Sequence, residues 1–238
     1  MPLFAFSDTH LSLSLDKPMD VFGCRWTDYV SKLEKGWKAV VSPDDTVIVG
    51  GDISWGMTLD EAKEDLLFLD RLPGKKIISK GNHDYWWSSL AKINNFFAEN
   101  GINTISLLHN NAFAVENKII CGSRGWFNEE KNCPRNADHA KIVAREALRI
   151  GQSIKEGFSL KESGNQDNEL IVFLHFPPVF KDEVCREIID VLKQYGIKKV
   201  YYGHIHGVYN IPADFEFEGI TFSICSADYL NFVPLLVR

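Results

Sequence analysis

Residues 3–10 read LFAFSDTH, four apolar residues followed by a polar turn that contains an aspartate and a histidine. A short apolar run that stops at a polar turn predicts a buried β-strand from Leu3 to Phe6. The same pattern recurs along the chain, and longer stretches with helical periodicity separate the apolar runs. This alternation of strands and helices indicates the α/β class.

Five apolar runs end at a cluster of Asp, Asn, Gly or His residues. In chain order they are LFAF before Asp8-Thr9-His10, TVIVG before Gly51-Asp52, KIISK before Gly81-Asn82-His83-Asp84, IVFL before His175, and KVYY before Gly203-His204-Ile205-His206. Because ligands bind beyond the carboxyl ends of strands in open α/β sheets, we expect the five clusters to converge on one site. Asp-x-His is common by chance, whereas Gly-Asn-His-Asp and Gly-His-x-His are rare, so the ordered combination is a strong signal.

The side chains in these clusters are of the types that bind divalent metals. Imidazole and carboxylate ligands without thiolate indicate Mn, Fe, Zn or Co rather than Ca. One ion takes three or four protein ligands, and the clusters offer more than that number. The sequence therefore predicts two ions about 3.5 to 4 Å apart, bridged by a carboxylate.

The order and spelling of these motifs resemble the calcineurin-like metallophosphoesterase superfamily over nearly the whole chain, from Asp8 to His206. The segments LSLSLDKPMDVFG, KGNHDYWW and GSRGWF resemble, more narrowly, a bacterial subgroup of predicted phosphohydrolases whose substrates are unassigned. The resemblance implies a four-layer αββα sandwich with two mixed β-sheets. It also implies the ligands, with Asp8, His10 and His206 on the first metal, Asn82, His175 and His204 on the second, and Asp52 bridging both.

The resemblance implies a dinuclear-metal phosphoesterase that hydrolyses a phosphomonoester or phosphodiester, either a small molecule or a nucleotide, by attack of a metal-bridging hydroxide. His83 is expected to face the substrate and to protonate the leaving oxygen as a general acid. Asp84 is expected to hydrogen-bond His83 and to set its tautomer and charge. Two alternatives stay open: a protein phosphatase with the same site, and a non-catalytic interaction scaffold on the same fold, against which the complete ligand set argues.

The segment GSRGW, residues 122–126, follows another apolar run. Arg124 and Trp126 are candidate substrate-binding residues, the arginine as a phosphate clamp and the tryptophan as a stacking surface for a base or sugar. An ordinary surface turn is the alternative. The two remaining histidines, His109 and His139, are interpreted as structural or exposed.

Composition narrows the functional class. The net charge of −6 argues against a general nucleic-acid binder. No apolar run approaches the roughly 20 residues of a membrane span, and the N-terminus lacks the features of a signal peptide. Five widely spaced cysteines argue against a disulfide framework or a zinc knuckle and indicate a reducing cytoplasm; Cys121 and Cys225 are expected to pack in the core. The expected partner is a phosphorylated substrate, while the oligomeric state and the native metal are left open.

No repeat or linker divides the chain, so the sequence predicts a single domain over residues 1–238. Helices are expected over roughly 26–41, 59–72, 86–99, 136–156 and 183–195. Besides the strands that precede the polar clusters, strands are expected over 105–108, 112–116 and 118–121, a polar loop over 161–169, and strands and turns from residue 208 onward.

Overall fold

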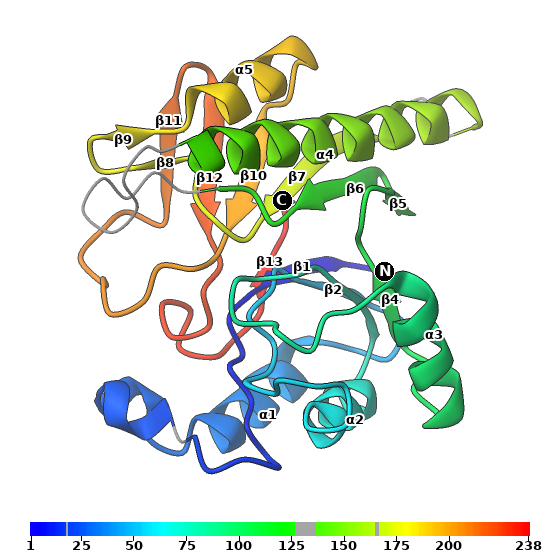
Figure 1. Ribbon diagram of the computed structural model, residues 1–238, viewed down its shortest axis with the longest axis vertical. Helices are drawn as coiled ribbons and strands as arrows, with labels where there is room; N and C mark the ends of the chain where they lie inside the picture. Colours follow the sequence, from blue (N-terminus) through cyan, green and yellow to red (C-terminus); the bar gives the residue numbers. More distant parts are fainter. Residues whose placement is uncertain (18, 127–136, 165–166) are drawn as a thin grey trace. The chain divides into compact units, whose positions relative to one another are not determined.

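The computed structural model describes residues 1–17, 19–126, 137–164 and 167–238 of the chain (Figure 1). Cys133, the expected helix start at Asn136 and residues 165–166 of the expected polar loop lie outside this part. The chain forms two compact units. The first unit comprises Met1–Leu107, His204–Ile211 and Cys225–Arg238, and the second comprises Leu108–Gly203 and Pro212–Ile224.

The first unit is built on a five-stranded sheet in the order β13-β1-β2-β3-β4. Strands β1 to β4 are parallel to their neighbours, and β13 is antiparallel to β1. Its elements are β1 (Leu3–Phe6), η1 (Met19–Phe22), η2 (Cys24–Trp26), α1 (Tyr29–Val40), β2 (Thr46–Val49), α2 (Lys63–Arg71), β3 (Lys75–Ile78), α3 (Leu90–Glu99), β4 (Ile105–Leu107) and β13 (Leu235–Leu236).

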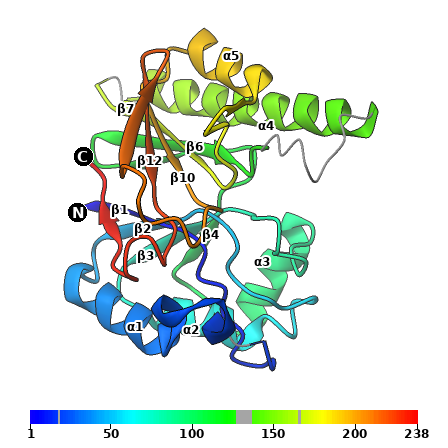
Figure 2. The ribbon, with the colours of Figure 1, turned by 90° about the vertical axis from the view of Figure 1, so that its left-hand side faces the viewer.

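A hydrophobic core joins one face of this sheet to helices α1, α2 and α3, which Figure 2 shows together beside the strands. Phe6 of β1 meets Trp37 of α1 edge to face, with 5.9 Å between the ring centroids. Alternate residues along a strand point to the same face, so Phe4 joins Phe6 in this core. The sheet and its helices thus form a rigid base for the loops at the carboxyl ends of the strands.

The second unit is built on a six-stranded sheet in the order β11-β12-β10-β7-β6-β5. The four central strands are parallel, and the edge strands β11 and β5 are antiparallel to their neighbours. Its elements are β5 (Phe113–Val115), β6 (Lys118–Ser123), α4 (Ala137–Glu162), β7 (Glu169–Leu174), β8 (Val179–Phe180), β9 (Glu183–Val184), α5 (Arg186–Gln194), β10 (Lys199–Tyr202), β11 (Asp214–Phe217) and β12 (Ile220–Ile224).

In the second unit, helix α4 lies along β6 and packs beside α5 (Figure 1). A Cβ atom on Gly157 of α4 would lie 2.6 Å from Sγ of Cys121 in β6, so only glycine permits this close approach. Burial raises the pKa of the Cys121 thiol to about 12. Cys121 and Cys225 are both buried, which confirms their expected role in the core.

The structure confirms the α/β class and shows two large mixed sheets with five α-helices in the described part of the chain. Several expected helix starts were too early. α1 begins at Tyr29, α2 at Lys63 and α3 at Leu90, where Ser89 caps the helix by accepting a hydrogen bond from the amide of Lys92. Apolar residues in the preceding loops are buried like helix residues, and for this reason the periodicity overran the true boundaries.

Two further helix boundaries differ from the prediction. The long helix continues to Glu162, beyond the expected end at residue 156 and into the expected polar loop. The segment expected as one helix from residue 183 begins with β9, and α5 starts only at Arg186.

No helix in the described residues is both long and apolar enough to cross a membrane.

Candidate metal centre

In the first unit, the polar clusters that follow β1, β2 and β3 lie at one edge of the sheet, because these strands are parallel neighbours. Backbone hydrogen bonds continue past the strand ends and hold the loops together. The amide of Asp8 donates to the carbonyl of Gly51, and the amide of His10 donates to the carbonyl of Asp52, both at 2.9 Å. The sheet register therefore fixes which polar residues meet.

The backbone at this edge adopts an uncommon conformation. Asp8, His10, Asp52 and His204 all have positive φ, between 44° and 67°. A left-handed residue other than glycine costs about 1–2 kcal/mol, and such strain persists where the surrounding structure fixes it, often at functional sites. Four predicted metal ligands share this strained conformation, which supports a functional role for the loops.

Asp8, His10 and His206 form a first group whose ligand atoms all lie within 4.8 Å of one another. Nε2 of His206 is 3.2 Å from Nε2 of His10 and 3.3 Å from Oδ1 of Asp8. Metal–nitrogen bonds are about 2.0–2.1 Å long, so a single cation can contact both imidazoles. Two nitrogens and one carboxylate suit a first-row divalent metal, and the group fits the predicted chemistry.

Asp52 lies beside this group. Its Oδ2 is 3.7 Å from Nε2 of His10, and a ligand atom of His204 lies within 4.8 Å. The backbone amide of His204 donates to both oxygens of Asp8, at 3.1 and 2.9 Å. Asp52 is therefore close both to the first group and to a ligand predicted for the second ion, as a bridging carboxylate must be.

Glycine is required where the loops approach each other. A Cβ atom on Gly81 would lie 2.1 Å from Oδ1 of Asp52 and 2.3 Å from its backbone nitrogen. The amide of His83, two residues later, donates to the same Oδ1 at 2.8 Å. The glycine that begins Gly-Asn-His-Asp is thus explained by contact with the Asp52 carboxylate. Asn82 lies in this loop and is half-buried.

The second unit contributes one predicted ligand, His175, which directly follows β7 and is fully buried. Its backbone amide donates to the carbonyl of Arg124 at 3.1 Å. His175 therefore occupies the strand-end position that the sequence predicted for it.

The two imidazoles of the first group have opposite pKa shifts. Burial lowers the pKa of His10 to about 4, despite the nearby charge of Asp52. Burial also disfavours the charged form of His206, but the charge of Asp8 and the hydrogen bond to Asp228 outweigh it and raise the pKa to about 10. In the metal-free protein at neutral pH, His206 is protonated and His10 is neutral.

We expect metal binding to release about one proton at pH 7, because His206 must lose its proton before it can bind a cation. The sign follows from the raised pKa: below pH 10 protons compete with the metal, so affinity for this ligand set increases with pH, by up to about tenfold per unit. Titration calorimetry of Mn²⁺ in buffers with different ionisation enthalpies measures the proton count. Binding without proton release would contradict the assignment of His206 as a ligand.

Asp84 has a different set of partners from the one expected. Its two oxygens accept five hydrogen bonds, from the backbone amides of Gly81, Asp52, Ile53 and Ser54 and from the indole N–H of Trp86. The prediction that Asp84 hydrogen-bonds the His83 ring is therefore corrected, because the Asp84 carboxylate binds the backbone of the two loops instead. Burial and the charge of Asp52 raise the pKa of Asp84 to about 6.

The His83 ring lies beside the first group, 5.7 Å from the His10 ring between centroids, and is half-buried. Trp55, which the sequence prediction missed, contacts both rings: its centroid is 5.0 Å from that of His10 and 4.5 Å from that of His83. Trp55 follows Gly51-Asp52 in the same loop, and this position is the only feature of the sequence that places Trp55 near the candidate ligands. The indole forms an apolar wall beside the candidate ligands.

Asp228 was also missed. It is fully buried and accepts a hydrogen bond from Nδ1 of His206 at 2.9 Å. Asp228 follows the apolar run of β12 by a few residues, a strand-end pattern like the others, but no histidine or glycine beside it marked it as special.

Arg124 and Trp126 lie together in the second unit. Nη2 of Arg124 is 3.6 Å from Oε1 of the buried Glu146, and its guanidinium lies 5.2 Å from the centroid of Trp126. The Trp126 indole donates to Nδ1 of the buried His139 at 3.4 Å. Both candidate side chains are thus tied into the second unit, and their contact with a substrate stays a prediction.

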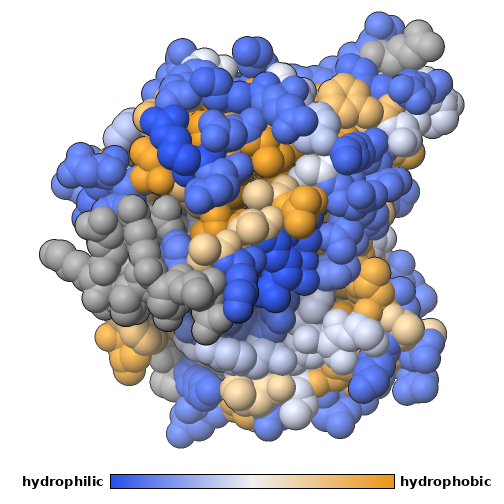
Figure 3. All heavy atoms as spheres, turned by 45° about the horizontal axis from the view of Figure 1, so that its top comes forward, coloured by the Kyte–Doolittle hydropathy of each residue, from blue (hydrophilic) through white to orange (hydrophobic). Residues whose placement is uncertain are grey.

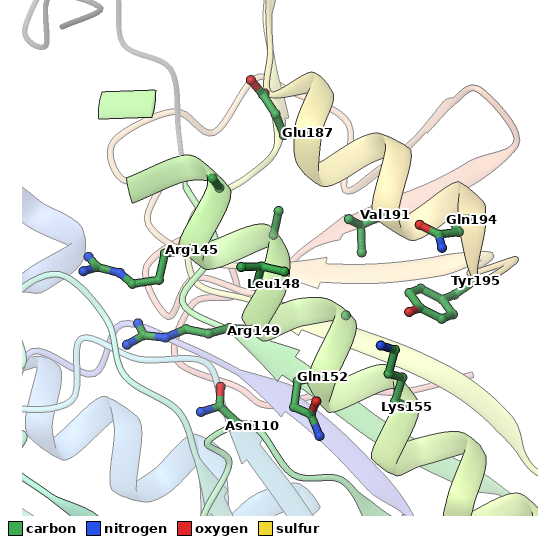
Figure 4. Close-up of a pocket in the computed structure, with 13 residues that line it drawn as sticks. Asn110, Arg145, Leu148, Arg149, Gln152, Lys155, Glu187, Val191, Gln194 and Tyr195 are labelled. Carbon is green, nitrogen blue, oxygen red and sulfur yellow. The ribbon is translucent and has the colours of Figure 1, made fainter. Parts of the chain in front are cut away.

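A groove of about 740 Å³ lies in the second unit between α4 and α5 (Figure 4). Arg145, Leu148 and Lys155 of α4 and Val191 of α5 contribute to its walls. The face that Figure 3 shows has apolar side chains gathered among hydrophilic ones. The lining of this groove includes no histidine, cysteine or aspartate, and its one carboxylate, Glu187, is too few donors for a metal centre, so the groove is not the candidate site.

Comparison with known proteins agrees with this geometry. The chain is similar to the crystal structure of a protein of unknown function, AQ665 from Aquifex aeolicus, with a TM-score of 0.51 and 15% identity over 99% of this chain and 95% of that chain. At this identity the likeness concerns the fold alone. No curated protein sequence matches the chain significantly. A family profile described as calcineurin-like phosphoesterase matches residues 1–208, which include every strand-end cluster, and the chain therefore belongs to this family.

Proposed function

We propose that this phosphoesterase hydrolyses a phosphomonoester or phosphodiester of a small molecule or nucleotide with two divalent cations as cofactors. The observation that carries the proposal is the convergence of Asp8, His10 and His206 beside Asp52 at one sheet edge of the first unit. When bound, paired cations neutralise phosphoryl oxygens and lower the pKa of a water nucleophile. Mn, Fe, Zn and Co fit the donor set.

Each ligand has a proposed position. Asp8, His10 and His206 would hold the first cation, Asn82, His175 and His204 would hold the second, and Asp52 would be shared by both. The contacts inside the first unit support the first set and Asp52. For His175 the support is its place at the carboxyl end of β7 and the span of the family match.

His83 is proposed as the general acid that donates a proton to the leaving oxygen. Its backbone amide is anchored to Asp52, and its ring lies between Trp55 and Tyr85, with centroids 4.5 and 6.3 Å away. Asp84 acts as a positioning residue, because it holds the backbone of the loop from which His83 projects.

We expect His83→Ala to lower kcat for an alkyl phosphate by about 10²–10⁴-fold, the usual contribution of a general acid. For 4-nitrophenyl phosphate we expect a loss below about tenfold, because this leaving group departs without a proton. Metal content should stay at the wild-type value. The two substrates serve as each other's control, and kcat measured on both gives the ratio.

Equal losses on both substrates would contradict the role of His83 as the acid, and loss of metal would show that His83 belongs to the ligand set instead.

The proposed activity is tested with the metal-loaded protein on 4-nitrophenyl phosphate and on bis(4-nitrophenyl) phosphate. Turnover of one ester identifies a monoesterase or a diesterase. No turnover of either ester with Mn²⁺ bound would overturn the proposal and favour an interaction scaffold. Preference for a phosphoprotein over every small ester would favour a protein phosphatase.

Arg124 and Trp126 stay proposed contacts for the phosphate and for a base or sugar of the substrate. Because Arg124 lies 3.6 Å from the Glu146 carboxylate, which Arg149 also contacts, its contribution to phosphate binding is expected to be smaller than that of a guanidinium with no acidic neighbour. We further propose a reducing compartment such as the cytoplasm, since Cys24, Cys121 and Cys185 are free thiols.

A further inference from the structure

A hydrogen-bond network centred on the buried Asp228 lies behind the first ligand group. Asp228, fully buried, accepts three hydrogen bonds through its carboxylate: from Nδ1 of His206 at 2.9 Å, from the amide of Gly207 at 3.0 Å and from the Tyr209 hydroxyl at 2.9 Å. Gly207 has a φ of 69°, a conformation that glycine adopts readily, and this turn brings its amide to Asp228. The network lies wholly in the first unit.

We propose that Asp228 is a positioning residue of the metal centre, which aims Nε2 of His206 at the first cation. This inference rests on the proposed function. A carboxylate only accepts hydrogen bonds, so Nδ1 of His206 must carry a proton and donate it to Asp228. Nε2 then becomes the nitrogen available for a cation, and it faces Nε2 of His10 and Oδ1 of Asp8.

Further contacts, made by Arg25 and Tyr229, hold the residues of this network in place. The Arg25 guanidinium, from η2, lies 3.6 Å from the centroid of the Tyr209 ring and donates to the backbone carbonyl of Asp228 at 2.9 Å. The Tyr229 hydroxyl donates to the carbonyl of Ile211 at 2.9 Å. These contacts fasten residues 204–211 to the turn that carries Asp228, so the direction of the His206 ring is fixed by three separate segments of the chain.

The geometry distinguishes this role from simple loop stabilisation. Gly207 and Tyr209 alone could anchor the turn, and neither contact would need His206. The Asp228 oxygen that binds His206 is Oδ1, whereas Gly207 and Tyr209 use Oδ2. One carboxylate oxygen is thus devoted to the imidazole, which is the arrangement that sets the tautomer of a metal-binding histidine.

The test measures Mn²⁺ affinity by titration calorimetry of the full chain and its variants. We expect Asp228→Asn to weaken one of two sites by about 10–100-fold, the usual effect of removing such a partner, and to leave the other site unchanged. Tyr209→Phe, which keeps the carboxylate and removes one of its donors, should weaken the same site by less than about tenfold.

Asp70→Asn is the matched control. Asp70 also accepts three hydrogen bonds through one carboxylate, from the amides of Asn103 and Thr104 and from the Thr104 hydroxyl. These residues precede β4, so they lie at the amino-terminal edge of the sheet, opposite the candidate ligands. The control should bind Mn²⁺ like the wild type while losing stability.

Each outcome has a defined meaning. An unchanged affinity of Asp228→Asn, or an equal loss in Asp70→Asn, would overturn the inference alone. Failure of the wild type to bind Mn²⁺ would overturn the proposed function and the inference with it. Should Asp228→Asn not fold, the nitrogen-15 spectrum of the imidazoles in the wild type loaded with diamagnetic Zn²⁺ decides: a His206 proton on Nδ1 supports the role of Asp228, and a proton on Nε2 overturns it.

Discussion

Replacing Asp52 by Asn is expected to reduce the bound metal from two ions to at most one and to lower phosphoesterase turnover by about 10²-fold or more. The carboxylate is buried beside His10 and His204, and an amide of the same shape lacks the charge that binds two cations. Asn keeps an oxygen for the amide of His83, so the loop should retain its structure. Elemental analysis of purified protein and kcat on an aryl phosphate measure the two effects.

The control for this variant is Asp45→Asn. Asp45 is also buried, but it precedes β2, whereas Asp52 follows it, so the two residues lie at opposite ends of one strand. Its carboxylate accepts a hydrogen bond from the amide of Ser42 at 2.8 Å. Asp45→Asn should retain metal content and turnover. Two ions bound to Asp52→Asn at wild-type affinity would exclude Asp52 as the bridge.

Replacing Asp84 by Ala is expected to lower the free energy of unfolding by about 3–5 kcal/mol, the range for removing one partner of a buried charged network. Five donors lose their acceptor, and four of them are backbone amides of the loops after β2 and β3. Each buried donor left unsatisfied costs about 1–3 kcal/mol, although rearrangement and entering water recover part of this. Urea unfolding of the metal-free protein measures the change.

Asp84→Asn should be nearly as destabilising, because an amide nitrogen would face N–H donors at one of the two oxygen positions. Asp44→Ala, at an exposed position, is the control and should change stability by no more than about 0.5 kcal/mol. A fully stable Asp84→Ala protein would show that other contacts hold the two loops in place.

Strand positions were largely predictable from sequence. Leu3–Phe6 and Thr46–Val49 match the expected strands because a short buried run bounded by turn residues leaves few alternatives. Helix starts were not predictable, since Trp26 and Trp86 are buried in the turns before their helices. The described structure, with two mixed sheets and five α-helices, is consistent with the sandwich fold of the family.

The predicted ligands have the clearest sequence signal, because each belongs to a loop that directly follows a strand. A parallel sheet brings such loops together without further information, and thus the loops that carry Asp8 and Asp52 meet as expected. The hydrogen-bond partners of Asp84 were mistaken because adjacency in sequence to His83 was taken for a contact. In the structure the Asp84 side chain accepts hydrogen bonds from several backbone amides of the two loops. These donors outnumber the single imidazole, and the backbone already fixes their positions.

The sequence by itself determined the fold class, the family and the donor types of the metal centre, since these depend on local patterns of burial and on short motifs. Tertiary structure alone decided which groups contact the site residues: Asp228 bonds His206, Trp55 lies beside His83, and Asp84 binds the backbone of both loops. Such contacts join residues that no spacing rule connects, and they arise only when the strands of the sheet have set the distances between distant loops.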